Sequence, residues 1–177
     1  MTKQHNSILI FVALLACFMG ACSRPTNNNS AAAPANTEPK RITSVGVVKA
    51  SPQPATIEHG ASADATVQIT IGNGYHVNAN PATFPYLKAT VLDVSSAEGV
   101  SAGAVKYPKG QERSFVFADK PLSVYEGTVA LQVALRAESG AKPGARSLSA
   151  QLHVQACDEQ VCYPPGTIAL TIPVEVK

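Results

Sequence analysis

The feature that most constrains the fold is a strict alternation of apolar residues in the C-terminal part of the chain. Apolar side chains occupy every second position over residues 148–156 and again over residues 168–176. A period of two places these side chains on one face of an extended strand. We therefore expect both runs to form half-buried strands that pair with each other in the antiparallel direction.

Further alternating runs cover residues 67–71 and 129–135, and shorter candidate strands lie near 44–48, 55–58, 88–94 and 114–117. Together they give about seven to nine strands in roughly 135 residues, which is typical of an all-β domain. No stretch after residue 22 shows a helical period. Because two sheets can each bury one alternating face, we predict an immunoglobulin-like antiparallel β-sandwich with a small aliphatic core.

Length and charge exclude several classes of protein. The chain has 177 residues, enough for one ordinary globular domain, and its 14 Lys and Arg against 12 Asp and Glu leave a net charge of only +2. No basic field for nucleic acid is present. The only long apolar run covers residues 8–21, and a membrane span needs about 20 apolar residues, so pumps, channels and multi-span carriers are excluded.

The first 22 residues have the layout of a secretory signal peptide, with Lys3, an apolar stretch and then small residues. The run 19–22 resembles a bacterial lipoprotein signal, which predicts that Cys22 is acylated and becomes the new N-terminus. Cys17 matches the same pattern, but cleavage there would shorten the apolar stretch. A secreted protein without a lipid is the other interpretation.

Residues 23–42 are rich in Asn, Ala, Pro, Thr and Ser and have no hydrophobic periodicity. This composition predicts a disordered tether. The folded domain should then cover residues 43–177. With a lipid at Cys22, the protein would be exported to the periplasm and anchored to a membrane.

Cys157 and Cys162 are the only cysteines outside the predicted leader, so they can form a disulfide in an exported protein. By strand parity Cys157 falls on the outward face with His153 and Gln155, where a partner could reach it. A six-residue ring removes only about 2 kcal/mol of unfolded-state entropy, against nearly 5 for a ring of about a hundred residues. This pair is therefore poorly placed as a structural staple, which favours a redox role, although a structural bridge stays open.

Metal binding is the third interpretation of the pair, because His153 could join Cys157 and Cys162, and such ligands suit zinc or copper. No second CxxC or HxxxH motif supports it, and both methionines lie in the predicted leader. We predict no metal site and no cofactor. His59 and His76 stand alone in the sequence and are expected at the surface or in turns.

The segment from Gln155 to Pro165, which reads QACDEQVCYPP, resembles the active-site segment of the N-terminal periplasmic domain of the thiol:disulfide interchange protein DsbD. Three upstream segments resemble that family in the same order, namely GYHVNAN at 74–80, YPKG at 107–110 and LSVYEG at 122–127. The resemblance covers about residues 44–177. It implies an immunoglobulin-like domain with a redox-active disulfide.

The resemblance also implies roles and partners. Cys157 and Cys162 would receive electrons from a membrane-embedded DsbD-like or CcdA-like donor and pass them to periplasmic thioredoxin-like proteins or a disulfide isomerase, as in cytochrome c biogenesis. Such a chain would be a protein-disulfide reductase-type electron relay. Phe117 is the best match to an aromatic cap over the disulfide, with Phe115 as the alternative. Apart from the resemblance, the rigid aromatic-proline segment at Tyr163 and Pro164 directly after Cys162 is expected to present a docking surface.

Three expectations complete the sequence-based picture. Because the sequence ends at Lys177, the electron donor should be another polypeptide. Asp158 and Glu159 should disfavour thiolate formation, so we expect the reduced pair to be a poor nucleophile. By the resemblance to the family, Cys162 should form the mixed disulfide with a partner. The alternative function is a lipid-anchored immunoglobulin-like binding or adaptor module with a structural disulfide.

Overall fold

The computed structural model describes residues 41–177. The predicted signal peptide (1–22), the acylation site at Cys22 and all but the last two residues of the predicted tether (23–42) lie outside the described residues. Within the described part of the chain, no helix is long and apolar enough to cross a membrane.

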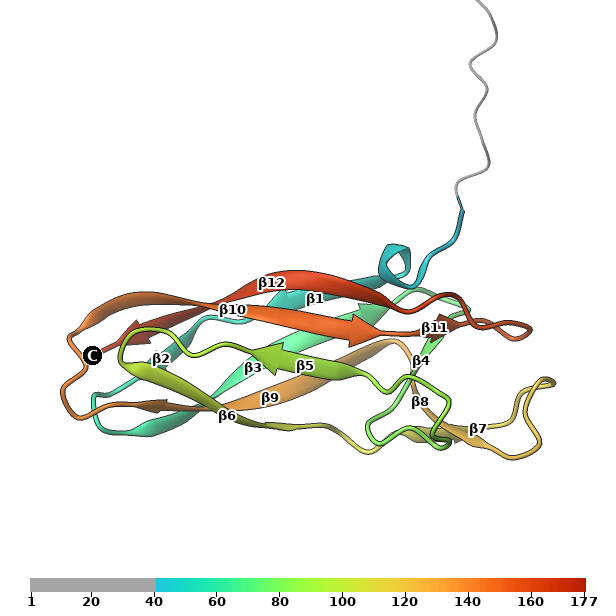
Figure 1. The fold of residues 1–177 in the computed structure, drawn as a ribbon, viewed down its shortest axis with the longest axis horizontal. Helices are drawn as coiled ribbons and strands as arrows, with labels where there is room; N and C mark the ends of the chain where they lie inside the picture. The colour runs from blue at the N-terminus through green and yellow to red at the C-terminus, as the bar shows by residue number, and fades with distance from the viewer. Residues whose placement is uncertain (1–40) are drawn as a thin grey trace, which may run out of the picture. The chain divides into compact units, whose positions relative to one another are not determined.

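Two four-stranded sheets form the body of the domain (Figure 1). The first has the order β1-β3-β9-β6 and contains β1 (Val48–Pro52), β3 (Ser62–Ile71), β9 (Thr128–Ala137) and β6 (Val100–Lys106). The second has the order β2-β12-β10-β5 and contains β2 (Ala55–Ile57), β12 (Gly166–Val176), β10 (Gly144–Val154) and β5 (Val91–Val94). Only the β12–β2 pair is parallel among these neighbours. The predicted immunoglobulin-like β-sandwich is confirmed.

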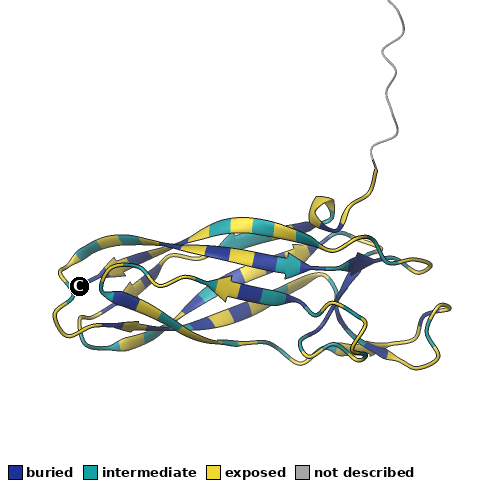
Figure 2. Ribbon diagram, in the orientation of Figure 1, coloured by how far each residue is buried: buried dark blue, intermediate teal, exposed yellow. Residues whose placement is uncertain are grey.

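The predicted pairing of the two late strands is also confirmed. β10 and β12 run antiparallel along their whole length, with Leu148 opposite Ile172 and Leu152 opposite Ile168. Buried and exposed residues alternate along the long strands, as Figure 2 shows. The buried faces of both sheets join in one aliphatic core, where each fully buried Leu or Ile contributes about 1.5–3 kcal/mol.

A third, smaller sheet has the order β11-β4-β8-β7. Its strands are β11 (Ala156–Cys157), β4 (His76–Asn78), β8 (Leu122–Tyr125) and β7 (Gln111–Arg113). β11 follows β10 after one residue, and β4 follows β3 after a turn in which Gly74 has a φ of +80°. The third sheet therefore extends both sheets of the sandwich at one end (Figure 1).

Two local predictions are wrong. Residues 44–46 form a 3-10 helix, and the strand begins only at Val48. Residues 114–117 do not form a strand, because β7 pairs with β8 from Arg113 opposite Leu122 and residues 114–121 are needed to connect them. The Ala118 amide donates to the Phe115 carbonyl at 3.1 Å, which closes a turn in this loop.

The strand count of seven to nine is too low, since the described residues contain twelve strands. The four strands of the third sheet have only two to four residues each. Runs this short cannot show a period of two, so alternation could not reveal them.

Candidate functional site

The two cysteines close a tight hairpin at the end of β11. Cys157 and Cys162 are joined by a disulfide with an S–S distance of 2.03 Å, and their Cα atoms are 3.9 Å apart. The Tyr163 amide donates to the Ala156 carbonyl at 2.8 Å, and the Asp158 amide donates to the Val161 carbonyl at 2.9 Å. These bonds flank the cysteines, so the disulfide joins a non-hydrogen-bonded pair, the position where opposite side chains come closest.

Asp158 organises the loop between the cysteines. Its Oδ1 accepts hydrogen bonds from the amides of Gln160 and Val161, both at 2.8 Å, and its Oδ2 accepts one from the Tyr163 hydroxyl at 2.5 Å. The Tyr163 hydroxyl and the two amides hold the pKa of the Asp158 carboxyl below its usual value. The same bond raises the pKa of Tyr163 to about 12. A negative charge is therefore fixed beside Cys157.

Ser44 ties the base of the hairpin to the sandwich. Its side chain is fully buried. Its hydroxyl donates to the Pro164 carbonyl at 2.7 Å and accepts from the Ala156 amide at 3.0 Å. One hydroxyl thus holds both strands of the hairpin through backbone groups, independently of the disulfide.

The expected exposure of Cys157 is wrong. Its side chain is 0% exposed, whereas Cys162 is half-buried. Parity fails because the chain leaves the second sheet after Val154 and pairs with β4 instead. In this new pair, Ala156 and its partner Val77 face the sandwich core, while Cys157 and its partner His76 lie on the opposite face.

Aromatic rings stack on the Cys157 side of the third sheet. His76 lies parallel to Phe115, with ring centroids 4.0 Å apart, and Phe115 lies parallel to Phe117, with centroids 5.3 Å apart. Phe115 is buried and Phe117 is 39% exposed. The predicted cap residue Phe117 is therefore the outermost ring of the stack, and its alternative Phe115 is the ring in contact with His76.

His76 is not at the surface as expected, because only 2% of it is exposed. Burial and the nearby Arg113 guanidinium lower the pKa of His76 to about 4, so the imidazole is neutral at pH 7. His59 is exposed in a turn, as predicted, with its Nδ1 3.2 Å from the Lys177 carbonyl.

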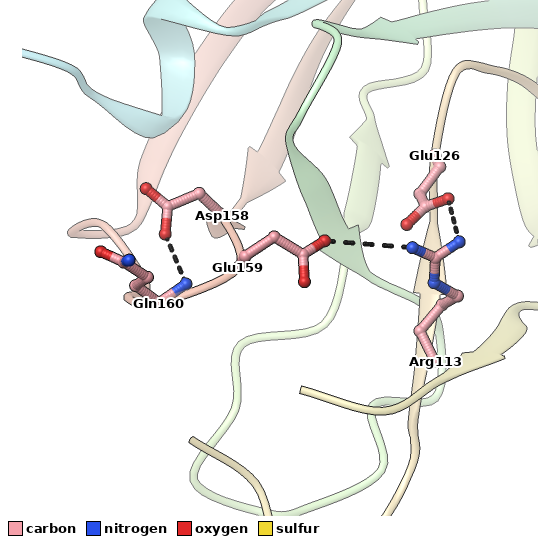
Figure 3. A network of polar contacts seen from close by, with 5 residues as sticks. All are labelled: Arg113, Glu126, Asp158, Glu159 and Gln160. Carbon is pink, nitrogen blue, oxygen red and sulfur yellow. Dashed lines mark hydrogen bonds and ion pairs between the residues drawn. The ribbon is translucent and has the colours of Figure 1, made fainter. Parts of the chain in front are cut away.

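A polar network joins the hairpin to the strands beside the aromatic stack (Figure 3). The Arg113 guanidinium lies between two carboxylates, 3.3 Å from Glu126 and 3.9 Å from Glu159. Arg113 ends β7 and leads into the loop that carries Phe115 and Phe117, while Glu159 lies in the hairpin. Because all three side chains are partly exposed, we expect this network to orient the hairpin relative to the loop that follows β7, and to contribute little to the free energy of unfolding.

The ligand set considered for a metal does not come together. The His153 ring binds Thr167 at 2.9 Å and Asp93 at 3.1 Å on the second sheet. Over residues 41–177, no group of three or more His, Cys, Asp or Glu side chains is placed to hold a metal ion.

Several exposed apolar side chains lie in the hairpin and in the loops that contribute to the aromatic cluster. Val161 at the hairpin tip is 52% exposed, and Val116 beside Phe117 is 91% exposed. Tyr86 is 72% exposed and stacks on Phe84, which packs against the Phe115 cluster. Of the other predicted site residues, Tyr163 is half-buried, 6.1 Å from the ring of Tyr75, and Pro164 is exposed.

Sequence reasoning missed Ser44, His76 and Arg113. His76 lies in the segment 74–80 that carried the family resemblance, but nothing in its spacing assigned it a role. Ser44 and Arg113 are far from the cysteines in the sequence, and only the pairing of short strands brings them to the site.

A family model described as "Thiol:disulfide interchange protein DsbD, N-terminal" matches residues 46–172. No curated protein matches the chain. Among solved structures, the N-terminal periplasmic domain of ScsB from Proteus mirabilis is similar at 13% identity with a TM-score of 0.48, covering 71% of this chain and 44% of that one. A family 123 glycoside hydrolase from Clostridium perfringens is similar at 13% identity with a TM-score of 0.35, covering 74% of this chain and 27% of that one.

Proposed function

The chain belongs to the family of N-terminal domains of the thiol:disulfide interchange protein DsbD, and from this premise we propose that its Cys157–Cys162 pair relays electrons between exported proteins. The donor is a membrane-embedded DsbD-like or CcdA-like thiol carrier. The clients are periplasmic thioredoxin-like proteins or a disulfide isomerase, including those of cytochrome c biogenesis.

The observation that carries the proposal is the unequal exposure of the two sulfur-bearing residues. A thiolate must reach one sulfur of a disulfide directly for exchange to occur. Cys162 is half-buried at the outer strand of the hairpin, whereas Cys157 is 0% exposed. Attack therefore falls on Cys162 Sγ, and Cys157 Sγ is the leaving group.

The exchange transfers two electrons in two steps. The thiolate of a donor dithiol attacks Cys162 Sγ, the Cys157–Cys162 bond breaks, and Cys157 Sγ leaves with the electron pair and gains a proton. The second donor thiolate then attacks the donor sulfur of the mixed disulfide and releases Cys162 Sγ. The donor ends as a disulfide and the domain as a dithiol, and the reverse sequence reduces a client.

The apolar side chains around the hairpin suit a protein partner. Val161 is exposed in the hairpin that carries Cys162, and Val116 and Phe117 are exposed in the loop that carries the aromatic stack. Tyr163 and Pro164 follow Cys162 on the outer strand of the hairpin. The aromatic stack lies on the face of the third sheet that carries Cys157, so it restricts the access of small thiols to the disulfide. A protein partner that displaces Phe117 would react with the disulfide faster than a small thiol.

The reduced pair is a poor nucleophile without a partner. The fixed negative charge of Asp158 lies next to Cys157 and raises the cost of a second negative charge there. Within residues 41–177 there is no α-helix whose N-terminus could stabilise a thiolate. Reaction then depends on an activated cysteine in the partner, which limits random reduction of exported proteins.

The N-terminal region gives the proposed location. Residues 1–22 act as a lipoprotein signal, Cys22 carries the lipid, and residues 23–42 form the tether. The domain is thus exported and held near a membrane, within reach of a membrane-embedded donor.

The test is to trap mixed disulfides with single-cysteine variants of the protein and a reduced thioredoxin-like partner that lacks its resolving cysteine. Before the reaction, each variant is activated at its remaining cysteine with an aromatic disulfide reagent. Cys157→Ala, which retains Cys162, should form the complex rapidly, and Cys162→Ala should form it slowly. Intact mass spectrometry measures both.

The double variant Cys157→Ala/Cys162→Ala is the matched control and should trap nothing. Equal trapping by both single variants would overturn the assignment of Cys162. If no thioredoxin-like partner undergoes exchange with the wild-type disulfide, the relay function is wrong. The binding or adaptor module then becomes the better interpretation.

A further inference from the structure

His76 is the residue directly opposite Cys157 in the third sheet. The two residues are register partners in the antiparallel β4–β11 pair. Directly opposite side chains on one face of such a pair have Cβ atoms about 4.5–5.5 Å apart. Both side chains are buried, with 2% of His76 and 0% of Cys157 exposed.

The imidazole has an unused hydrogen-bonding atom in this buried place. Among the described residues, His76 Nε2 finds no hydrogen-bond partner although it is shielded from solvent. An unpaired buried polar atom is destabilising, so its retention calls for an explanation. In the oxidised protein the sulfur of Cys157, the register partner of His76, carries no proton, and on reduction Cys157 becomes a thiol that can donate one.

Burial and the Arg113 guanidinium disfavour the protonated form of the His76 ring, whereas the Asp158 carboxylate favours it. Phe115 stacks on one face of the ring, and Arg113 from β7 and Asp158 from the hairpin are the charged groups that act on it. Arg113 is itself paired with Glu126 and Glu159. The ring is neutral at pH 7 and is the buried base on the face of the sheet that carries Cys157.

We infer that His76 exchanges a proton with Cys157 Sγ during thiol–disulfide exchange, an inference that rests on the proposed function. When a partner thiolate attacks Cys162 Sγ, negative charge develops on Cys157 Sγ in a buried site. The neutral ring gives one ring proton to that sulfur and regains one from solvent at its other nitrogen, so Cys157 leaves as a neutral thiol. The attacking thiol has lost one proton to solvent, and the proton count balances.

In the opposite direction the Cys157 thiol gives its proton to His76 Nε2 and attacks Cys162 Sγ of the mixed disulfide. The Cys157–Cys162 bond forms, the partner sulfur leaves with the electron pair and is protonated by solvent, and His76 releases the Cys157 proton to solvent. This route avoids a free thiolate at a buried position next to Asp158, where it would be costly.

The structural alternative is that His76 serves only as a flat ring beneath Phe115. Two variants separate the roles. His76→Phe keeps an aromatic ring for the stack and removes both nitrogens. Phe115→Leu removes the stack and keeps the imidazole. Thermal unfolding and near-ultraviolet circular dichroism confirm that both variants are folded.

The first readout is the rate of oxidation of each reduced variant by an oxidised thioredoxin-like partner as a function of pH. His76→Phe should lower the rate at pH 7 by about 100-fold and steepen its rise with pH, because loss of a general acid–base group costs about 10²–10⁴-fold. Phe115→Leu should keep the wild-type pH profile. An unchanged rate and profile for His76→Phe would overturn the inference. Absence of exchange in the wild-type protein would instead overturn the proposed function.

A second readout uses the wild-type protein and does not depend on partner exchange. The ¹⁵N chemical shifts of the His76 ring are measured by NMR in the oxidised and reduced states. Formation of a Cys157 thiol next to Nε2 should shift that nitrogen and couple its titration to the thiol, while the exposed His59 ring stays unchanged as an internal control. Identical Nε2 shifts and titration in the two redox states would contradict the inference.

Discussion

Replacing Ser44 with Ala should destabilise the domain through the disulfide hairpin. The Ser44 hydroxyl accepts from the Ala156 amide at 3.0 Å and donates to the Pro164 carbonyl at 2.7 Å. Both Ser44 and Ala156 are fully buried, so the Ala156 amide has no access to water when the hydroxyl is removed. A methyl group cannot replace either bond.

The magnitude follows from these two bonds. Leaving the buried Ala156 amide unpaired costs about 1–3 kcal/mol, and the lost bond to the Pro164 carbonyl costs about 0.5–1.5 kcal/mol. The expected loss in the free energy of unfolding is therefore about 1.5–4.5 kcal/mol. With an m-value of about 2 kcal/mol/M, the urea midpoint should fall by about 0.8–2.2 M.

Equilibrium urea unfolding of the oxidised protein measures this change, and Ser147→Ala is the matched control. Ser147 is exposed on β10, so its replacement should change the free energy of unfolding by less than about 0.5 kcal/mol. Hydrogen exchange should also show faster exchange of the Ala156 amide in Ser44→Ala. A change no larger than that of the control, with Ala156 still protected, would refute the assigned role of Ser44.

Three further predictions concern pH, the cap and backbone packing. The folded-state pKa of Asp158 is lowered, so its stabilising effect is present above about pH 4 and is lost as the pH falls through the lowered pKa. Asp158→Asn should therefore make the free energy of unfolding in urea less dependent on acid pH. An unchanged pH dependence would contradict this. Phe115→Ala should speed reduction of the disulfide by dithiothreitol several-fold and cost about 3 kcal/mol of stability, and no gain in rate would argue against a cap. Gly110→Ala should destabilise the folded domain by more than about 1 kcal/mol, because the new Cβ would lie 2.6 Å from the Ala79 Cβ and close to the Ser123 hydroxyl. In the control Gly140→Ala the new Cβ meets open space, so this variant should have the melting temperature of the wild-type protein.

The sandwich could be predicted from the sequence because its long strands bury one face each. Leu148, Leu152 and Ile172 recur with a period of two and lie in the core shared by both sheets. A strand with one buried face must show this alternation, so the pattern and the pairing of β10 with β12 follow directly from burial.

The site was less predictable because it lies on short strands that do not follow this alternation. At β11 and β4 both faces of the third sheet are covered, so Cys157 and His76 are buried. Strand parity had predicted that Cys157 is exposed, and the isolated position of His76 in the sequence had predicted the same for His76. The cysteine pair was evident from composition alone, since no other cysteine lies outside the leader. Ser44 and Arg113 reach the hairpin only through tertiary packing, which no local pattern records.

The most direct test of the relay function is the reduction potential of the Cys157–Cys162 pair. The purified protein is equilibrated in graded glutathione or dithiothreitol buffers, and the oxidised fraction is read by thiol alkylation and mass spectrometry. An exchange-active pair should have a potential between about −180 and −270 mV. A value below about −300 mV, typical of structural bridges, would contradict the relay function and favour a binding module on the same fold.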